Sequence, residues 1–181
     1  LLYGTSLLAG TLGTASLPEI ALRMPELLDG GPSPLASAAA RTAVLGALFV
    51  FAGLAFKLAL VPFHFWCPDA FEGASAEVAG FLSIAPKAGA FALLVRFIQS
   101  VFGTETAAVE ELRYAFGLGV AVVSALTMTL GNLAAFGQEN VKRLFAYSTI
   151  AHAGYLLMGV AAWMVAGGEA GRRGLEGLLY Y

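Results

Sequence analysis

The chain has few charged residues and few side chains that bind metals. Only 12% of its 181 residues are charged, whereas soluble domains carry about 25%. The formal net charge is −2 at pH 7, so there is no basic field to attract nucleic acid. A single cysteine, Cys67, excludes an internal disulfide framework and a cysteine metal cluster. The two histidines, His64 and His152, give no convincing zinc or haem motif.

Long apolar runs dominate the sequence instead. Hydrophobic residues make up 59% of the chain, and the mean hydropathy is +0.78. A membrane-spanning helix needs about 20 apolar residues, and the runs are too long for strands and lack a period of two. We therefore predict an all-α, polytopic transmembrane helix bundle with four complete spans and a partial span at both ends. The complete spans are predicted at residues 42–61, 78–95, 114–138 and 144–168, and the partial spans at 1–13 and 174–181.

Three smaller features concern the organisation of the chain. Pro18–Leu28 mixes apolar and charged side chains, which predicts a short helix lying at the membrane interface. Ser124, Thr127 and Gly131 are predicted to line a small-residue packing face. The sequence lacks an initiator methionine and stops inside an apolar run, so we expect residues 1–181 to be a fragment of a single transmembrane domain in a longer chain.

The two kinds of cation are sorted differently along the chain. Lys57 and Lys87 fall deep in apolar spans, and Lys142 falls at the start of one. All seven arginines fall in connections or near span ends: Arg23, Arg41, Arg96, Arg113, Arg143, Arg172 and Arg173. Lysine changes its pKa readily when buried, whereas arginine keeps its proton. A charge in mid-span costs about 2.5–3.5 kcal/mol, so we predict that Lys57 and Lys87 carry protons. The alternatives are a structural ion pair or snorkelling, and snorkelling suits Lys142 best.

A proline lies close to each of the two deep lysines. Pro62 follows Lys57 by five residues, and Pro86 immediately precedes Lys87. An interior proline removes a helical hydrogen bond and kinks or breaks the helix. Freed carbonyl groups at membrane depth are tolerated where protein or water satisfies them. We therefore predict discontinuous helices, with breaks at Pro62 and Pro86 that let water reach the lysines; an ordinary kink is the alternative.

Both histidines are candidates for a proton path. His64 follows Lys57 by seven residues, so an unbroken helix would place both on one face. A hydrogen bond from His64 to a freed carbonyl group would explain the presence of this histidine equally well. His152 lies inside the last complete span, on a polar stripe formed with Ser148, Thr149 and Tyr155. Such a stripe suits an internal water chain, although interhelical hydrogen bonding worth under about 1–2 kcal/mol is the alternative.

Acidic residues gather after Pro62. Asp69, Glu72 and Glu77 lie between the first and second complete spans. We expect them to solvate a loop, with an ion pair to a neighbouring subunit as the alternative.

Three separated motifs, in order, resemble one protein family. The run 56–74, which contains Lys57, Pro62 and His64, resembles the lysine-bearing broken helix of antiporter-like subunits of respiratory complex I. The run 81–88, with Lys87, resembles the next helix, and the runs 131–135 and 140–155 resemble a later helix pair. Pro-Asp-Ala-Phe-Glu-Gly and Asn-Val-Lys-Arg look most like the subunit N family, the bacterial relative of mitochondrial subunit 2. One departure is Ser75-Ala76-Glu77, where the family usually has Thr-Pro or Ser-Pro.

The resemblance implies roles for particular residues. Residues 1–181 would be part of an antiporter-like domain that moves protons while other subunits oxidise NADH and reduce quinone. Lys57 would hold a proton at the helix break, Lys87 would pass it towards the membrane centre, and His152 would extend the polar axis. His64 and Lys142 are secondary candidates. The carboxylate partner of Lys57 in this family is a glutamate one helix before Leu1.

The resemblance also implies partners and a location. The expected partners are other complex I membrane subunits, the lipid bilayer and protons, with no nucleic acid. We expect no cofactor in this chain, and FMN, iron–sulfur clusters and quinone in partner subunits. The expected location is the bacterial inner membrane, as a multi-pass protein, or an energy-transducing membrane if the protein is organellar. A subunit of a multisubunit cation/proton antiporter and a structural membrane scaffold are the alternatives.

Overall fold

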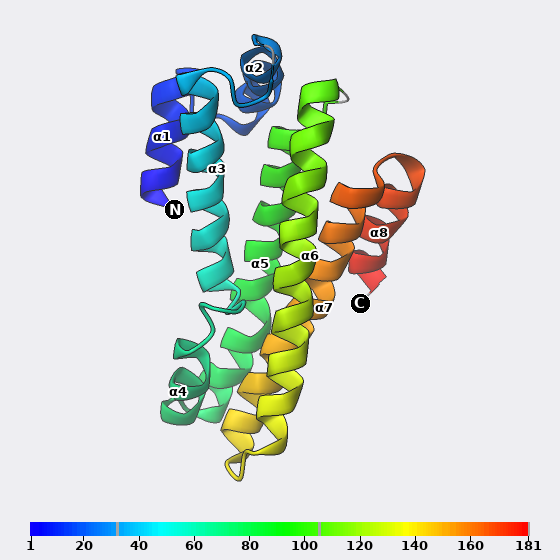
Figure 1. Cartoon of the computed structure of the whole chain (residues 1–181). Helices are drawn as coiled ribbons and strands as arrows, with labels where there is room; N and C mark the ends of the chain where they lie inside the picture. Colours follow the sequence, from blue (N-terminus) through cyan, green and yellow to red (C-terminus); the bar gives the residue numbers. More distant parts are fainter. Residues whose placement is uncertain (32, 105, 181) are drawn as a thin grey trace. The chain divides into compact units, whose positions relative to one another are not determined.

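The structure, a computed structural model, describes residues 1–31, 33–104 and 106–180; the side chains of Arg172, Leu179 and Tyr180 are outside this description. The described residues form eight helices and no strand, which confirms the all-α prediction (Figure 1). The helices are α1 (Leu2–Leu12), α2 (Leu17–Asp29), α3 (Ala38–Lys57), α4 (Trp66–Gly73), α5 (Ala76–Phe102), α6 (Ala107–Phe136), α7 (Val141–Ala166) and α8 (Gly168–Tyr180).

The four predicted complete spans are confirmed as α3, α5, α6 and α7, which are long and apolar enough to cross a membrane. Helices α5 and α6 extend beyond the uncharged runs, so that Arg96 and Arg113 belong to helices. The 30 residues of α6 correspond to about 45 Å of helix, which exceeds the roughly 30 Å hydrocarbon core. Charged residues at the ends of such helices can therefore reach the interfacial region.

The helices divide into two compact units, Leu1–Leu54 with Ala92–Ala115, and Ala55–Phe91 with Phe116–Tyr181. In the first unit, α1 packs against α3. A Cβ atom on Gly4 would lie 2.7 Å from the carbonyl oxygen of Gly46, so only glycine allows this close approach. The rings of Tyr3 and Phe49 meet edge to face at 5.3 Å on the same pair of helices.

The predicted short helix at Pro18–Leu28 is confirmed as α2; its position at the membrane interface stays a prediction. Its apolar side chains Ile20, Met24 and Leu28 are buried, and its charged side chains lie outside. Nη1 of Arg23 donates a 2.6 Å hydrogen bond to the carbonyl oxygen of Leu12, at the end of α1. This bond satisfies one of the carbonyl groups that a helix terminus leaves free.

In the second unit, α6 and α7 pack through small residues, as predicted for Ser124, Thr127 and Gly131. Ser124 and Thr127 are fully buried, and Oγ of Ser124 donates a 2.7 Å hydrogen bond to the carbonyl oxygen of Gly154. A Cβ atom on Gly154 would lie 2.7 Å from the backbone nitrogen of Met128, and one on Gly131 would lie 2.8 Å from that of Ala151. Small residues at such an interface let two membrane helices approach closely.

Candidate functional site

The helix that carries Lys57 ends at Lys57 itself, not at Val61 as predicted. The N–H of Leu60 donates to the carbonyl oxygen of Ala55 at 2.9 Å, and the N–H of Ala59 donates to that of Phe56 at 3.1 Å. These two bonds, with Ala59 at φ 56°, form a Schellman motif, which ends a helix by a left-handed residue. A non-glycine residue in this conformation costs about 1–2 kcal/mol, so the surrounding packing must enforce the break.

Pro62 lies beyond this helix end, so it does not interrupt a helix from inside as predicted. It follows the Schellman motif in a position where proline is common because a helix cannot continue there. The predicted discontinuity itself is present, since residues 58–65 are not helical and α4 begins at Trp66. The predicted cause is wrong, because the Schellman motif before Pro62 ends the helix and not the proline.

Two polar backbone groups at the break have partners within the protein. The N–H of Val61 donates to Oγ1 of Thr127 at 3.1 Å. Nε1 of Trp66 donates to the carbonyl oxygen of Phe56 at 3.0 Å. At membrane depth each unsatisfied backbone group costs several kcal/mol, so non-helical backbone needs such partners. Thr127 was predicted only as a packing residue, and its role at the break depends on the tertiary fold.

Lys57 is the last residue of α3, and its side chain is exposed. Within the part of the chain that the structure describes, it has neither a hydrogen-bond nor an ion-pair partner. A charged side chain facing lipid is costly, and such residues normally face protein or a water-filled cavity.

Lys87 is in a different environment, because its side chain is buried with 7% exposure. Its Nζ donates a 3.0 Å hydrogen bond to the carbonyl oxygen of Thr149 on α7. Cys67 on α4 is buried in an apolar cluster with Ala146 and Ile150, which flank Thr149 on α7. These residues come from three different helices, and no bond joins Lys87 to Lys57 among the described residues.

Pro86 does not break the helix that carries Lys87. Helix α5 continues from Ala76 to Phe102 with the proline inside it, so the predicted break at Pro86 is wrong. The proline leaves the carbonyl group of Leu82 without its helical donor. Helical geometry continues because the flanking turns of this long helix keep their own bonds, as is tolerated in membrane helices.

His64 lies in the break between α3 and α4, so it does not share a helical face with Lys57. Its Nδ1 atom is buried and has no hydrogen-bond partner within the described residues. Its carbonyl oxygen accepts a 3.0 Å hydrogen bond from the N–H of Cys67 at the start of α4. The helix is broken between the two residues, so the condition for a shared face is not met; the role of His64 in a proton path stays a prediction.

His152 lies on α7 with an exposed side chain. Its ring meets that of Tyr155 edge to face at 5.8 Å, and the hydroxyl oxygen of Tyr155 accepts a 2.7 Å bond from Nδ2 of Asn132. Thr149 belongs instead to the surroundings of Lys87. The predicted stripe therefore contributes to two polar groups, one around Lys87 and one around His152.

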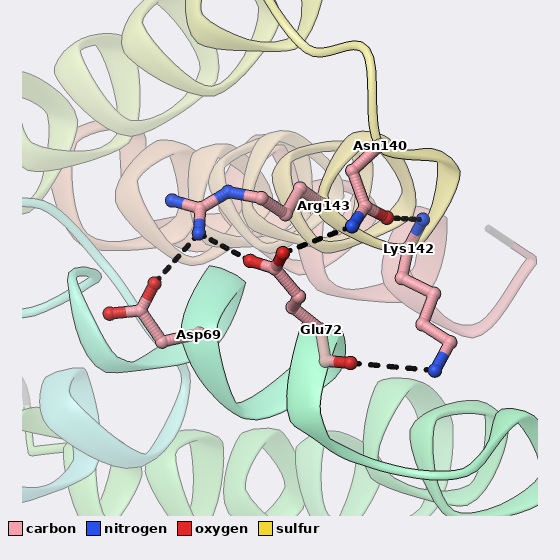
Figure 2. Close-up of polar contacts among 5 residues, drawn as sticks. All are labelled: Asp69, Glu72, Asn140, Lys142 and Arg143. Carbon is pink, nitrogen blue, oxygen red and sulfur yellow. Dashed lines mark hydrogen bonds and ion pairs between the residues drawn. The ribbon is translucent and has the colours of Figure 1, made fainter.

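Five polar residues connect α4 to the start of α7, and we call them the α4–α7 network: Asp69, Glu72, Asn140, Lys142 and Arg143 (Figure 2). Nη1 of Arg143 donates to Oδ1 of Asp69 at 2.9 Å and to Oε2 of Glu72 at 2.6 Å. Nδ2 of Asn140 donates to Oε1 of Glu72 at 3.1 Å. The hydrogen bond from Arg143 is the main reason that the pKa of the Glu72 carboxyl is lowered from its ordinary value.

Lys142 and the acidic residues differ from what the sequence predicted. Nζ of Lys142 donates to the carbonyl oxygen of Ala74 at 2.8 Å and to that of Glu72 at 3.4 Å, so it is held at the end of α4 rather than snorkelling freely. Asp69 and Glu72 were expected to solvate a loop, but they belong to α4 and pair with α7. Their spacing of three residues and the opposite charges at 142–143 were the only sequence signals for this pairing.

Comparisons with known proteins identify the family of the chain. A family model described as "NADH:quinone oxidoreductase/Mrp antiporter, TM" matches residues 1–172. The chain belongs to this family. It is 42% identical to NADH-quinone oxidoreductase subunit N of Anaeromyxobacter sp. (strain Fw109-5), over 100% of this chain and 34% of that protein. It is 41% identical to subunit N of Desulforamulus reducens, over 100% of this chain and 33% of that protein.

A solved structure also resembles this chain. A chain of respiratory complex I from Thermus thermophilus with bound aureothin is similar, with a TM-score of 0.61 and 36% identity. The match covers 88% of this chain and 30% of that one. The predicted resemblance to subunit N is thus confirmed, and the chain spans about a third of the length of these relatives.

Proposed function

We propose that this chain is part of a membrane-arm subunit of NADH–quinone oxidoreductase that translocates protons through Lys57, Lys87 and His152. Proton movement would be coupled to NADH oxidation and quinone reduction in partner subunits, which would carry FMN and iron–sulfur clusters. The names of the relatives support this assignment. The location proposed is the bacterial inner membrane, with other complex I membrane subunits and lipid as neighbours.

The observation that carries the proposal is the environment of Lys87. Its amine is buried in a membrane-spanning helix, and no carboxylate pairs with it among the described residues. A purely structural lysine at such a position would normally be paired. A buried lysine can instead exchange its proton, because desolvation disfavours the charged form.

The hydrogen bond from Lys87 to Thr149 suits a proton carrier. A protonated amine has three N–H donors and no acceptor, and a neutral amine still has two. The bond to the Thr149 carbonyl oxygen therefore persists in both states. The nitrogen atom stays in place while a different proton leaves or arrives.

Lys57 and His152 need the rest of the subunit to take part. Both side chains are exposed in these 181 residues, which span about a third of the relatives' length. We propose that Lys57 is charged while paired with a carboxylate from outside this segment. When that pair opens, Lys57 loses stabilisation and its proton passes towards Lys87, with His152 extending the route.

The test is the proton yield per NADH of the assembled complex carrying variants of the full-length subunit. Lys57→Ala and Lys87→Ala should each abolish translocation attributable to this subunit while the complex still assembles. Ser83→Ala is the matched control, because it removes an exposed hydroxyl bonded only to its own helix one turn before Lys87. An unchanged proton yield in Lys87→Ala would refute the role of Lys87.

A cation/proton antiporter is the second candidate, because the matching family includes Mrp antiporters. It predicts sodium-dependent proton exchange in vesicles without NADH dehydrogenase subunits. Copurification of the full-length protein with NADH-oxidising subunits, and no sodium dependence, would decide for complex I.

A further inference from the structure

Helix α4 cannot maintain its position by its own stability. It has eight residues and no side-chain cap at its N-terminus, whereas isolated helices shorter than about 12 residues are marginal in water. Its inner side chains Cys67 and Phe71 belong to an apolar cluster with Ala146 and Ile150 of α7. The position of α4 must therefore come from tertiary contacts, among which those with α7 are prominent.

The start of α7 carries the charges that α4 complements. Lys142 and Arg143 lie in the first turn of α7, which contains no acidic residue. Cations are unfavourable there, because a helix N-terminus carries a partial positive charge. The carboxylates of Asp69 and Glu72 offset these charges, and Lys142 in turn lies at the carbonyl end of α4, where a cation is favourable.

The same two helices provide the surroundings of Lys87. Thr149, whose carbonyl oxygen accepts from Lys87, lies six residues after Arg143 on α7. Cys67, which packs with Ala146 and Ile150 of α7, lies five residues before Glu72 on α4. A shift of α4 relative to α7 would open this apolar cluster beside Thr149.

We propose that Arg143 and Glu72 are positioning residues for Lys87, because they fix α4 against the first turn of α7. This keeps the apolar cluster of Cys67 closed beside Thr149, whose carbonyl oxygen accepts from the Lys87 amine. The proposal rests on the proposed function of Lys87 as a proton carrier. Arg143 and Glu72 would then affect proton transfer through Lys87 without carrying protons themselves.

The test uses the complete complex with Arg143→Gln in the full-length subunit. Three quantities are measured: the amount of assembled complex, the rate at which N-ethylmaleimide alkylates Cys67, followed by peptide mass spectrometry, and the protons translocated per NADH. We expect normal assembly, alkylation about tenfold faster because α4 opens more often, and a reduced proton yield. Arg143→Lys, which retains the charge on a shorter side chain without the planar guanidinium, should give intermediate values.

Matched variants separate this effect from a general loss of charge. Glu139→Gln removes an exposed carboxylate from the connection between α6 and α7, which has no ion pair to α4 within the described residues. It should leave all three quantities unchanged. If Arg143→Gln fails to assemble, Glu72→Gln is judged by the same criteria. Adding Glu72→Gln to Arg143→Gln should have little further effect, because both variants break one network.

Each outcome has a separate meaning. A normal alkylation rate in Arg143→Gln would overturn the positioning of α4. Faster alkylation with a normal proton yield would overturn the effect on Lys87. A normal proton yield in Lys87→Ala would contradict the proposed function instead, and that result comes from a different variant.

Discussion

The surroundings of Lys57 and of Lys87 share a sequence pattern but differ in structure. Both lysines lie in apolar spans with a proline nearby. Lys57 ends its helix and is exposed, whereas Lys87 lies inside a continuous helix and is buried. Among the described residues, Lys87 has a polar partner, the carbonyl oxygen of Thr149, and Lys57 has none.

This difference between the two lysine sites shows that proline alone does not decide where a membrane helix ends. At Lys57 the helix ends because Ala59 adopts a left-handed conformation and because Thr127 and Trp66 satisfy the released backbone groups. At Lys87 the proline removes one bond and the helix continues. A break therefore requires partners for its polar groups, and these partners come from other parts of the chain.

The largest effect that would test this comparison is expected for Lys87→Arg. The guanidinium is larger and always charged, so a packed site without a carboxylate should be destabilised by about 1–3 kcal/mol from overpacking. Thermal unfolding of the assembled complex measures this loss. Lys57→Arg is the matched control and should lose less stability, because arginine keeps a cation for the carboxylate that we propose as the partner of Lys57. Equal losses at both sites would contradict the comparison.

The next effect is confined to the break and is expected for Thr127→Val. The substitution leaves the N–H of Val61 without its acceptor, and an unsatisfied buried donor costs about 1–3 kcal/mol. Hydrogen exchange of the amides at 58–65 should become faster. Thr5→Val, which removes an exposed hydroxyl bonded only within its own helix, should leave these amides unchanged; protection that survives Thr127→Val would show that the break does not need this acceptor.

The smallest effect is a pH dependence of α4. The pKa of the Glu72 carboxyl is lowered from its ordinary value, first by the hydrogen bond from Arg143, so folding depresses it. The contribution of the ionised Glu72 carboxylate to the folding stability is fully present above the ordinary glutamate pKa of about 4.3. It is lost as the pH falls through the lowered pKa. Hydrogen exchange of α4, corrected for intrinsic rates, should rise in that acidic window, and Glu72→Gln should remove this rise; a rise that persists in Glu72→Gln would assign it to another group.

Much of the architecture was predictable because lipid imposes a simple rule. A chain that crosses a bilayer must satisfy its backbone groups internally, so long apolar runs such as Tyr114–Gln138 become helices. The charged ends of these helices were missed, because Arg96 and Arg113 continue helical geometry beyond the apolar run. The break near Pro62 was predictable in place but not in cause, since Ala59 is not a residue that signals a left-handed conformation.

By itself the sequence determined the helical class, the four spans, the family motifs and the placement of two lysines in apolar surroundings, because periodicity, length and charge act locally. Only the tertiary structure decided which lysine is buried, that Thr149 accepts from Lys87, and that Asp69 and Glu72 pair with Arg143. These contacts join residues more than 60 positions apart. Their geometry depends on how α4, α5 and α7 pack, which no local pattern records.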